Sequence, residues 1–248
     1  MNVTIITASF NSALSIKTCL DSVVHQNYND IEYLIIDGKS SDATLKIIKV
    51  YQQKFPFIKL ISEKDSGIYD ALNKGVQLAS GDIIGFVHSD DFLEFNDIIY
   101  HIVSMTKSEN LDGVYGDLQY VDKSNTKKII RSWKSCDFKP RLLKQGWMPP
   151  HPTLFLKKEV YQKHGIFDLS YRISADYDFL LRIFKDPELK FGYLPKVITK
   201  MRVGGASNKS LKNIIKKSKE DYRAIRINNI GNFLTLARKN FSKIKQLF

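Results

Sequence analysis

Short apolar runs alternate with helix-like patterns over the first ninety residues. The runs have strand length and cover Val3 to Ala8, Glu32 to Ile36, Ile58 to Ile61 and Ile83 to Val87. The stretches between them carry apolar residues at helical spacing, as at Ile16, Leu20 and Val23. Strands that alternate with helices are typical of βαβ units, and runs without polar alternation suit strands buried on both faces. The pattern therefore predicts an α/β fold with a Rossmann-like, mostly parallel central sheet flanked by helices.

Capping residues mark the ends of the predicted helices. Ser41 is predicted to cap the second helix, because a serine hydroxyl accepts a hydrogen bond from a free N–H of a first turn. The third helix is predicted to open at residues 65–67, to run through Ala79 and to close at Gly81.

Beyond residue 91 the pattern is less regular. Leu111 to Val121 predicts a pair of strands, and Lys157 to His164 predicts a short helix. Three prolines between positions 149 and 152 exclude a regular helix around His151, because proline lacks an N–H and fixes φ. Ser174 is predicted to cap a further helix with two aspartates in its first turn.

The formal net charge of +12 lies mostly at the C-terminal end. Residues 209–248 contain eleven Lys and Arg against two acidic residues, a net +9, so residues 1–208 carry only +3. This division argues against a nucleic-acid binder and predicts a domain at 1–208 with a basic, amphipathic helical extension at 209–248. Apolar faces from Leu211 to Ile225 and from Phe233 to Phe248 suit an anionic membrane surface, or packing on the body or on another subunit.

Other features of the sequence indicate the cellular compartment. No apolar run approaches the roughly 18–20 residues needed to span a bilayer, and the first residues show no secretory signal. Cys19 and Cys136 have no metal-type spacing, as expected in a reducing compartment. We therefore expect a cytoplasmic protein, with peripheral attachment to the inner face of the membrane through the extension.

Two adjacent carboxylates, Asp90 and Asp91, follow the fourth predicted strand at the edge where open α/β sheets bind ligands. They repel each other unless they share a cation, and a divalent metal that also holds phosphate oxygens is the usual solution. The alternative is a solvated Asp-Asp turn. Asp37 ends the second strand beside the end of the first, where it is either a nucleotide contact or a turn residue.

Further charged residues also have two interpretations. Asp70 and Lys74 stand four positions apart and form either an ordinary helix-surface ion pair or part of a site. Asp176 and Asp178 are either catalytic or simply favourable anions at a helix N-terminus. His151 is either a metal or phosphate ligand or a structural hydrogen-bonding residue.

Four ordered motifs resemble one family. They are TIITASFN at 4–11, EYLIIDGKSSDAT at 32–44, SEKDSGIYDALNKG at 62–75 and HSDD at 88–91. Together they resemble the family 2 glycosyltransferases with the GT-A fold, in the group of bacterial O-antigen and polysaccharide transferases. The resemblance covers about residues 1–208 and implies a nucleotide-binding half at 1–100 and an acceptor-binding half at 101–208.

The resemblance also implies roles for single residues. The donor nucleotide would be bound by Thr7, Ser9, Asn11, Asp37, Asp65, Lys74 and Asp90. Mg²⁺ or Mn²⁺ would join Asp90 and Asp91 to the diphosphate, although His88 stands where many relatives carry Asp or Asn. Asp176 matches the catalytic base, with Ala175 in place of the family's glutamate. His151 and Asp178 are candidates for acceptor or phosphate contacts, and Asp178 is the second candidate for the base.

The implied reaction is inverting transfer of a sugar from a nucleotide diphosphate sugar, usually a UDP-sugar, to a saccharide or polyprenol-linked acceptor. Its setting would be the biosynthesis of O-antigen, lipopolysaccharide or capsule. One alternative is a nucleotidyltransferase, against which the absence of a glycine-rich loop at residues 9–12 argues. The other is a degenerate, non-enzymatic nucleotide-sugar-binding module at an anionic membrane. The intact Asp37, Asp90, Asp91 and Asp176 argue against it.

Overall fold

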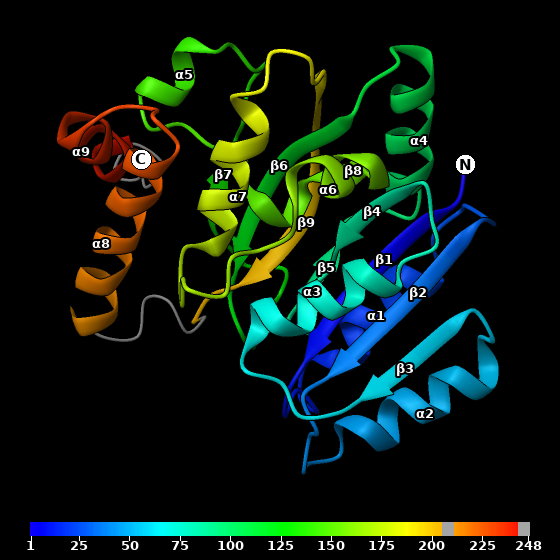
Figure 1. The fold of residues 1–248 in the computed structure, drawn as a ribbon. Coiled ribbons are helices and arrows are strands. Elements are labelled where there is room, and N and C mark those ends of the chain that lie inside the picture. The colour runs from blue at the N-terminus through cyan, green and yellow to red at the C-terminus, as the bar shows by residue number, and fades with distance from the viewer. Residues whose placement is uncertain (205–210, 243–248) are drawn as a thin grey trace.

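A computed structural model describes residues 1–204 and 211–242. Within them, one sheet of nine strands lies between layers of helices (Figure 1). The strand order is β3-β2-β1-β4-β8-β6-β9-β5, and β7 pairs with β6. Strands β3, β2, β1 and β4 are parallel neighbours, as are β6 and β9, whereas β5, β7 and β8 run antiparallel to their partners. The predicted α/β fold with a mostly parallel sheet is confirmed.

The N-terminal half alternates strands and helices as the hydrophobic pattern predicts. Its elements are β1 (Val3–Ser9), α1 (Ile16–Val24), β2 (Ile31–Asp37), α2 (Thr44–Lys54), β3 (Ile58–Ser62), α3 (Ile68–Leu78) and β4 (Ile83–Phe86). All residues of β1 and β4 are buried, because helices cover both faces of the sheet. The register pairs Ser9 with Asp37, so the carboxyl ends of β1 and β2 lie side by side.

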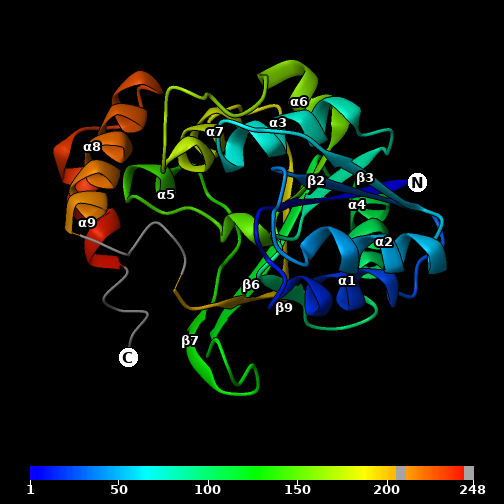
Figure 2. The ribbon, with the colours of Figure 1, turned by 90° about the horizontal axis from the view of Figure 1, so that it is seen from below.

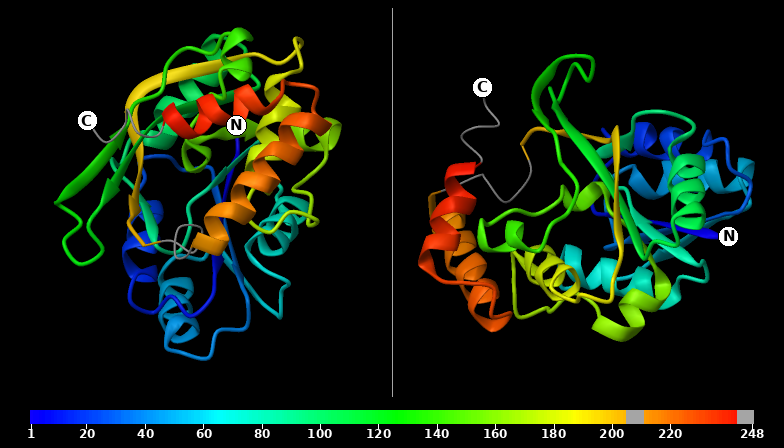
Figure 3. Two further views of the ribbon diagram at one scale, coloured as in Figure 1. Left: turned by 90° about the vertical axis from the view of Figure 1, so that its left-hand side faces the viewer. Right: turned by 90° about the horizontal axis from the view of Figure 1, so that it is seen from above.

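The remaining elements complete the sheet and its covering layers. They are β5 (Asp91–Leu93), α4 (Ile98–Ser108), β6 (Gly113–Val121), β7 (Ile129–Trp133), α5 (Arg141–Lys144), η1 (His151–Thr153), β8 (Phe155–Lys157), α6 (Lys158–His164), α7 (Ala175–Phe184), β9 (Phe191–Arg202), α8 (Leu211–Ile227) and α9 (Phe233–Ser242). The β6–β7 hairpin projects beyond the rest of the sheet (Figure 2, Figure 3). The short helix predicted at 157–164 is confirmed to within one residue.

One predicted helix cap is wrong, and another has the predicted position without the expected hydrogen bond. Ala43, not Ser41, is at the N-cap of α2. The Ser41 amide instead donates a hydrogen bond to Oδ1 of Asn11 at 2.9 Å, which ties it to the loop after β1. Ser174 does stand at the N-cap of α7, but its hydroxyl makes no capping hydrogen bond.

Two glycine-based predictions are also wrong. Helix α3 has its C-cap at Ala79. Gly81 instead allows the chain to pass close to β1, because a Cβ at Gly81 would lie 2.7 Å from the backbone nitrogen of Thr4. The predicted strand pair at 111–121 is the single strand β6. A glycine is needed at position 113 of β6, because a Cβ there would come within 2.5 Å of a methyl carbon of Leu156 on β8.

Two hydrophobic cores fill the space between the sheet and its helices. One lies under α1, α2 and α4 and contains Leu20, Ile48 and Ile102. The other lies under α3, α6 and α7 and contains Leu72 and Phe179. Tertiary packing on both faces therefore stabilises the sheet throughout its length.

Helices α8 and α9 pack against the edge of the second core, on the side of α7 (Figure 1). Ile225 and Leu236 are buried there, whereas Ile214, Ile215 and Phe233 are exposed, so the predicted apolar faces are divided between the core and the surface. The predicted boundary at 208, and the last residues of the second face, lie outside the described residues. No helix in the described part of the chain is both long enough and apolar enough to cross a membrane.

Candidate active site

The chain crosses from one half of the sheet to the other between β4 and β5. Strand β4 pairs with β1 in the N-terminal half, and β5 pairs with β9 at the far edge. In the crossing, the N–H of Asp91 donates a hydrogen bond to the carbonyl of His88 at 2.9 Å. Asp90 and Asp91 therefore lie just past the end of β4, where the sequence places them.

Asp91 carries a buried carboxyl group. Its side chain is 1% exposed, and Oδ1 has no hydrogen-bond partner in the part of the chain that the structure describes. Burial first, and then the charge of Asp90, raise the pKa of Asp91 well above its usual range. Asp90 is exposed, and its backbone carbonyl accepts a hydrogen bond from Nη1 of Arg202 at 2.6 Å. A buried carboxyl oxygen without a donor needs a partner, and a cation would be one.

The carboxylates fit the predicted Mg²⁺ or Mn²⁺. No group of three His, Cys, Asp or Glu side chains forms a ready-made metal cage within residues 1–204 and 211–242. Mg²⁺ is commonly bound through one or two carboxylates plus substrate phosphates and water. Asp90 and Asp91 match that donor set.

Two histidines lie beside the carboxylates. The rings of His88 and His151 have centroids 6.3 Å apart, and His151 stacks on Phe86 at 5.6 Å. Burial lowers the pKa of His151 to about 4. Burial also lowers the pKa of His88, while the charges of Asp90 and Asp176 act in the opposite direction. His151 is therefore neutral at physiological pH and forms an apolar-backed wall of the site.

Asp37 lies at the centre of a cradle of serine donors. Its Oδ1 accepts hydrogen bonds from the hydroxyls of Ser9 at 2.9 Å and Ser40 at 2.6 Å. Its Oδ2 accepts from the Ser40 amide at 2.8 Å and the Ser62 hydroxyl at 2.9 Å. Because a carboxylate has about four acceptor positions, a base N–H would have to replace one of these donors.

Thr7 and Asn11 hold the loops around this cradle. The Thr7 hydroxyl is buried and donates to the carbonyl of Val87 at 2.6 Å, so it joins β1 to the crossing that leads to Asp90. Asn11 has a φ of 48°, and its amide donates to the Ser40 hydroxyl at 2.8 Å. The two loops after β1 and β2 are thus joined.

Asp65 and Lys74 lie beyond Asp37 at the same edge. A Cβ on Gly38 would lie 2.5 Å from Oδ2 of Asp65, so this carboxylate rests directly on the loop after β2. Lys74 pairs with Glu63 at 2.9 Å and with Asp70 at 3.6 Å. The predicted i,i+4 ion pair is present, with Glu63 as the nearer partner.

Asp176 reaches the site from the first turn of α7. Its Oδ1 accepts a hydrogen bond from the Tyr69 hydroxyl at 3.0 Å, and that hydroxyl is also 2.7 Å from the carbonyl of Ile173. Burial first, and then the charge of Asp176, raise the pKa of Tyr69 well above its usual range. Tyr69 therefore keeps its proton and is a permanent donor between these two acceptors.

Asp178 lies on the same helix but is held by other contacts. It is buried, its Oδ2 accepts from Nε of Arg182 at 3.0 Å, and its Oδ1 accepts from Nδ2 of Asn228 at 2.8 Å. Both carboxylate oxygens thus have protein donors, an arrangement that favours a structural role between α7 and α8.

Sequence reasoning did not identify Tyr69 or Tyr120 as site residues. Tyr120 on β6 lies under the guanidinium of Arg131, 4.5 Å from its ring centroid. Burial raises the pKa of Tyr120, and the charges of Asp91 and Asp176 add to the shift. Tyr120 is therefore in electrostatic reach of both carboxylates, and only the tertiary structure brings it there.

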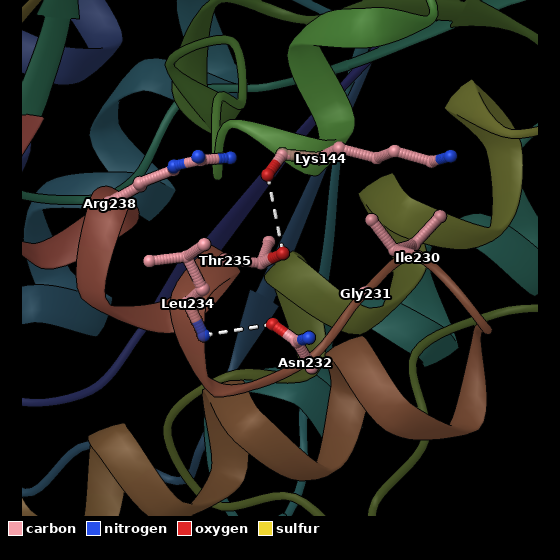
Figure 4. Close-up of a pocket in the computed structure, with 7 residues that line it drawn as sticks. All are labelled: Lys144, Ile230, Gly231, Asn232, Leu234, Thr235 and Arg238. Atoms are coloured by element: carbon pink, nitrogen blue, oxygen red, sulfur yellow. Dashed lines mark hydrogen bonds between the residues drawn. The ribbon is translucent and has the colours of Figure 1, made fainter.

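A separate hollow of about 280 Å³ lies between α5 and the α8–α9 turn (Figure 4). Its lining includes Lys144, Thr235 and Arg238, and the Thr235 hydroxyl donates to the Lys144 carbonyl at 3.2 Å. None of the predicted site residues lines this hollow.

The fold and the carboxylates at the strand ends define a GT-A glycosyltransferase, an enzyme that uses a nucleotide sugar. The chain belongs to glycosyl transferase family 2, whose model matches residues 4–167. It is 32% identical over 211 residues to the PGL/p-HBAD biosynthesis glycosyltransferase of Mycobacterium bovis, covering 82% of this chain and 78% of the relative. The predicted family is confirmed.

Two solved structures share the fold. S. aureus TarS 1–349 in complex with UDP-GlcNAc has a TM-score of 0.73 and 16% identity, covering 92% of this chain and 65% of that solved chain. The mannosyltransferase PcManGT of Pyrobaculum calidifontis, in complex with GDP-Man and Mn²⁺, has a TM-score of 0.65 and 18% identity, covering 91% of this chain and 63% of that protein. This chain therefore spans less than two thirds of either solved chain.

We expect Tyr69→Phe to lower turnover roughly tenfold with little change in donor KM. The variant loses one hydrogen bond to a charged group, worth about 1.5–3 kcal/mol, which orients Asp176. Steady-state release of the nucleoside diphosphate measures it. Tyr177→Phe is the matched control, because the Tyr177 hydroxyl is buried on α7, the helix of Asp176, and has no hydrogen-bond partner among the described residues. Equal turnover of both variants and the wild type would contradict the role of Tyr69.

Proposed function

We propose that this enzyme moves a sugar from a UDP-sugar to a hydroxyl of a saccharide or lipid-linked saccharide, with inversion at the anomeric carbon. The transfer requires Mg²⁺ or Mn²⁺ and serves the assembly of a bacterial surface polysaccharide. One observation carries the proposal: Oδ1 of Asp91 is buried beside Asp90 at the end of β4 and has no hydrogen-bond partner among the described residues. Asp176 on α7, which accepts a hydrogen bond from Tyr69, is a separate carboxylate that is proposed to serve the acceptor side.

The donor side consists of the loops after β1, β2 and β3. Ser9, Asn11 and Asp37 are proposed to bind the base and ribose, with Asp65 and Lys74 beside them. The Ser12 and Ser89 hydroxyls lie 2.8 Å apart, so the loop after β1 is joined to the loop that carries Asp90. This contact supports a continuous surface from nucleotide to diphosphate. The UDP-GlcNAc bound to TarS supports uracil, whereas the GDP-Man bound to PcManGT supports guanine.

On the acceptor side, Asp176 is proposed to be the general base. It takes the proton of the acceptor hydroxyl while the new C–O bond forms at the anomeric carbon. The bond to the diphosphate oxygen breaks on the opposite face, and its electron pair leaves with the diphosphate. Tyr69 holds Oδ1 of Asp176, which leaves Oδ2 for the acceptor proton. His151 and Tyr120 are proposed to line the space that the sugar occupies.

A divalent cation bound at Asp90 and Asp91 supplies positive charge to the departing diphosphate. In the protein itself, Asp91 provides a buried oxygen that no donor within the described residues satisfies. The Arg202 hydrogen bond to the Asp90 carbonyl fixes the backbone of the turn. The turn is therefore held in place while Oδ1 of Asp91 stays without a protein donor among the described residues.

A thermal-shift panel identifies the donor. UDP-GlcNAc, UDP-glucose, UDP-galactose and GDP-mannose are each tested with Mn²⁺ and with excess EDTA. A metal-dependent shift with one UDP-sugar supports the proposal, a shift with GDP-mannose alone corrects the base, and no shift with any nucleotide opposes a nucleotide-sugar enzyme.

We expect strict dependence on the cation. Excess EDTA should abolish donor cleavage, and Mn²⁺ should restore it. Asp91→Asn should remove both the activity and the extra thermal shift that Mn²⁺ gives with the donor, because the amide is a poorer cation ligand. Full activity in EDTA would remove the cation from the mechanism, and a normal Mn²⁺ response in Asp91→Asn would exclude Asp91 as its ligand.

We expect Asp176→Asn to cut turnover by roughly 10²–10⁴-fold, the usual contribution of a positioned base. The variant has the same shape and can still accept the Tyr69 hydrogen bond, so the donor thermal shift should persist. NMR of the product should show an anomeric configuration opposite to that of the donor. Asp178→Asn is the matched control. It should lower the melting temperature but leave turnover nearly unchanged, because Asp178 pairs with Arg182. A product that retains the donor's anomeric configuration, or near-normal turnover of Asp176→Asn, would contradict the assignment of Asp176 as the base.

We propose in addition that α8 and α9 bring the enzyme to an anionic membrane. Phe233 and Phe241 are 69% and 68% exposed, and Ile215 is also exposed. Lys216 and Arg226 are exposed on α8. Each basic residue near anionic lipid contributes about 1 kcal/mol, and exposed aromatic residues insert at the interface.

We expect the double variant Phe233→Ser/Phe241→Ser to lose most sedimentation with vesicles that contain phosphatidylglycerol. Both side chains are exposed, so the fold should be unaffected. Leu78→Ser, which removes an exposed leucine on α3, is the control and should sediment like the wild type. Negligible binding of the wild type at low salt would refute membrane attachment.

A further inference from the structure

Glu220 of α8 lies directly beneath the turn that leads into α7. Its side chain is only 9% exposed. Its Oε2 accepts hydrogen bonds from the backbone amides of Ile173 at 2.8 Å, Ser174 at 3.0 Å and Arg172 at 3.1 Å. Its Oε1 lies 3.2 Å from the Arg172 amide. One carboxylate thus satisfies three consecutive N–H groups that are 46–48 residues away in sequence.

The turn before α7 depends on this carboxylate. Ser174 occupies the N-cap, yet its hydroxyl makes no capping bond. Buried N–H groups without acceptors cost free energy, and a carboxylate near a helix N-terminus also interacts favourably with the helix dipole. Glu220 therefore takes over, from another helix, the role that a local cap usually has.

The same turn positions Asp176. The Ile173 amide donates to Glu220, and the Ile173 carbonyl accepts from Tyr69, whose hydroxyl also reaches Asp176. The peptide groups on both sides of Ile173 are thus fixed from opposite directions. Asp176 follows two residues after the last amide that Glu220 holds.

Helix α8 is itself fixed against α7. The Asn228 side chain donates to Asp178 at 2.8 Å, and the Arg223 guanidinium lies 4.5 Å from the Tyr171 ring centroid. Asp221 and Lys239 form a buried ion pair at 2.6 Å between α8 and α9. These contacts leave Glu220 little freedom to follow a displaced turn.

We propose that Glu220 is a positioning residue for Asp176, so that the C-terminal helices are part of the catalytic unit. The inference rests on the proposed role of Asp176 as the base. Loss of the Glu220 carboxylate frees the turn and misplaces the base, while the donor site at β1 and β2 is unchanged.

The test compares Glu220→Gln and Glu220→Ala in the full chain. Turnover is measured as release of nucleoside diphosphate from the panel's best donor with Mn²⁺ and water as acceptor. We expect roughly threefold loss of kcat for Glu220→Gln, whose amide oxygen can still accept, and roughly 30-fold for Glu220→Ala. Donor KM and the donor thermal shift should stay at the wild-type values. Hydrogen exchange in peptides that span residues 168–178 should rise in the same order.

Asn228→Ala is the matched control, because it removes another buried polar contact between the same two helices without touching residues 172–174. It should lower the melting temperature but keep kcat. Equal kcat losses in Asn228→Ala and Glu220→Ala would show general loosening and overturn the inference, as would normal exchange at 168–178 in Glu220→Ala. Asp176→Asn is assayed in parallel. If Asp176→Asn is inactive and Glu220→Ala is normal, only this inference fails; if Asp176→Asn is normal, the proposed function fails.

Discussion

Buried negative charge is the constraint on which the rest of this structure depends. Carboxylates at strand and helix ends have to be matched by donors, because an unpaired buried charge is costly. Asp37 is matched by serines, Asp178 by Arg182 and Asn228, and Glu220 by backbone amides. Asp91 differs, since its Oδ1 has no donor in the described part of the chain. Of these four carboxylates, only that of Asp91 keeps a buried oxygen for a ligand.

The location of that oxygen follows from topology. The chain leaves β4 in one half of the sheet and joins β9 in the other through β5. The turn in between has to stand at the junction of the two halves, close to α7 and to the crossing strands. In the proposed reaction, donor and acceptor would approach this junction from opposite halves, which would bring two separately bound substrates together.

The sequence alone predicts the N-terminal half well, because each strand and helix there has its own hydrophobic period. Asp37, Asp90 and Asp91 could be placed at strand ends for the same reason. The burial of Asp91 rather than Asp90 could not be predicted, since pairing of β5 with the distant β9 decides it. Ser41 fails as a cap because α2 begins only at Thr44, whose amide donates to the side chain of Asp42 instead.

The roles of Tyr69 and Glu220 illustrate the same limit. The Tyr69 hydroxyl contacts Asp176, which lies 107 residues away in sequence. A local sequence pattern cannot predict such a contact. Likewise, the charge count of the C-terminal extension treats every ionic side chain as free, although Glu220, Asp221 and Lys239 are buried. Periodicity identifies amphipathic helices there but not which side each face packs against.

The packing of α8 on α7 has a practical consequence for anyone who builds hybrid enzymes. A crossover after residue 204 looks natural, because the resemblance to the family covers only about residues 1–208 and the last two helices follow it. Yet a foreign helix would have to present a carboxylate at the position of Glu220 and an amide at that of Asn228. Replacing the last two helices therefore also replaces the contacts that they make with the turn before α7. Hybrid enzymes should take residues 168–242 from one parent.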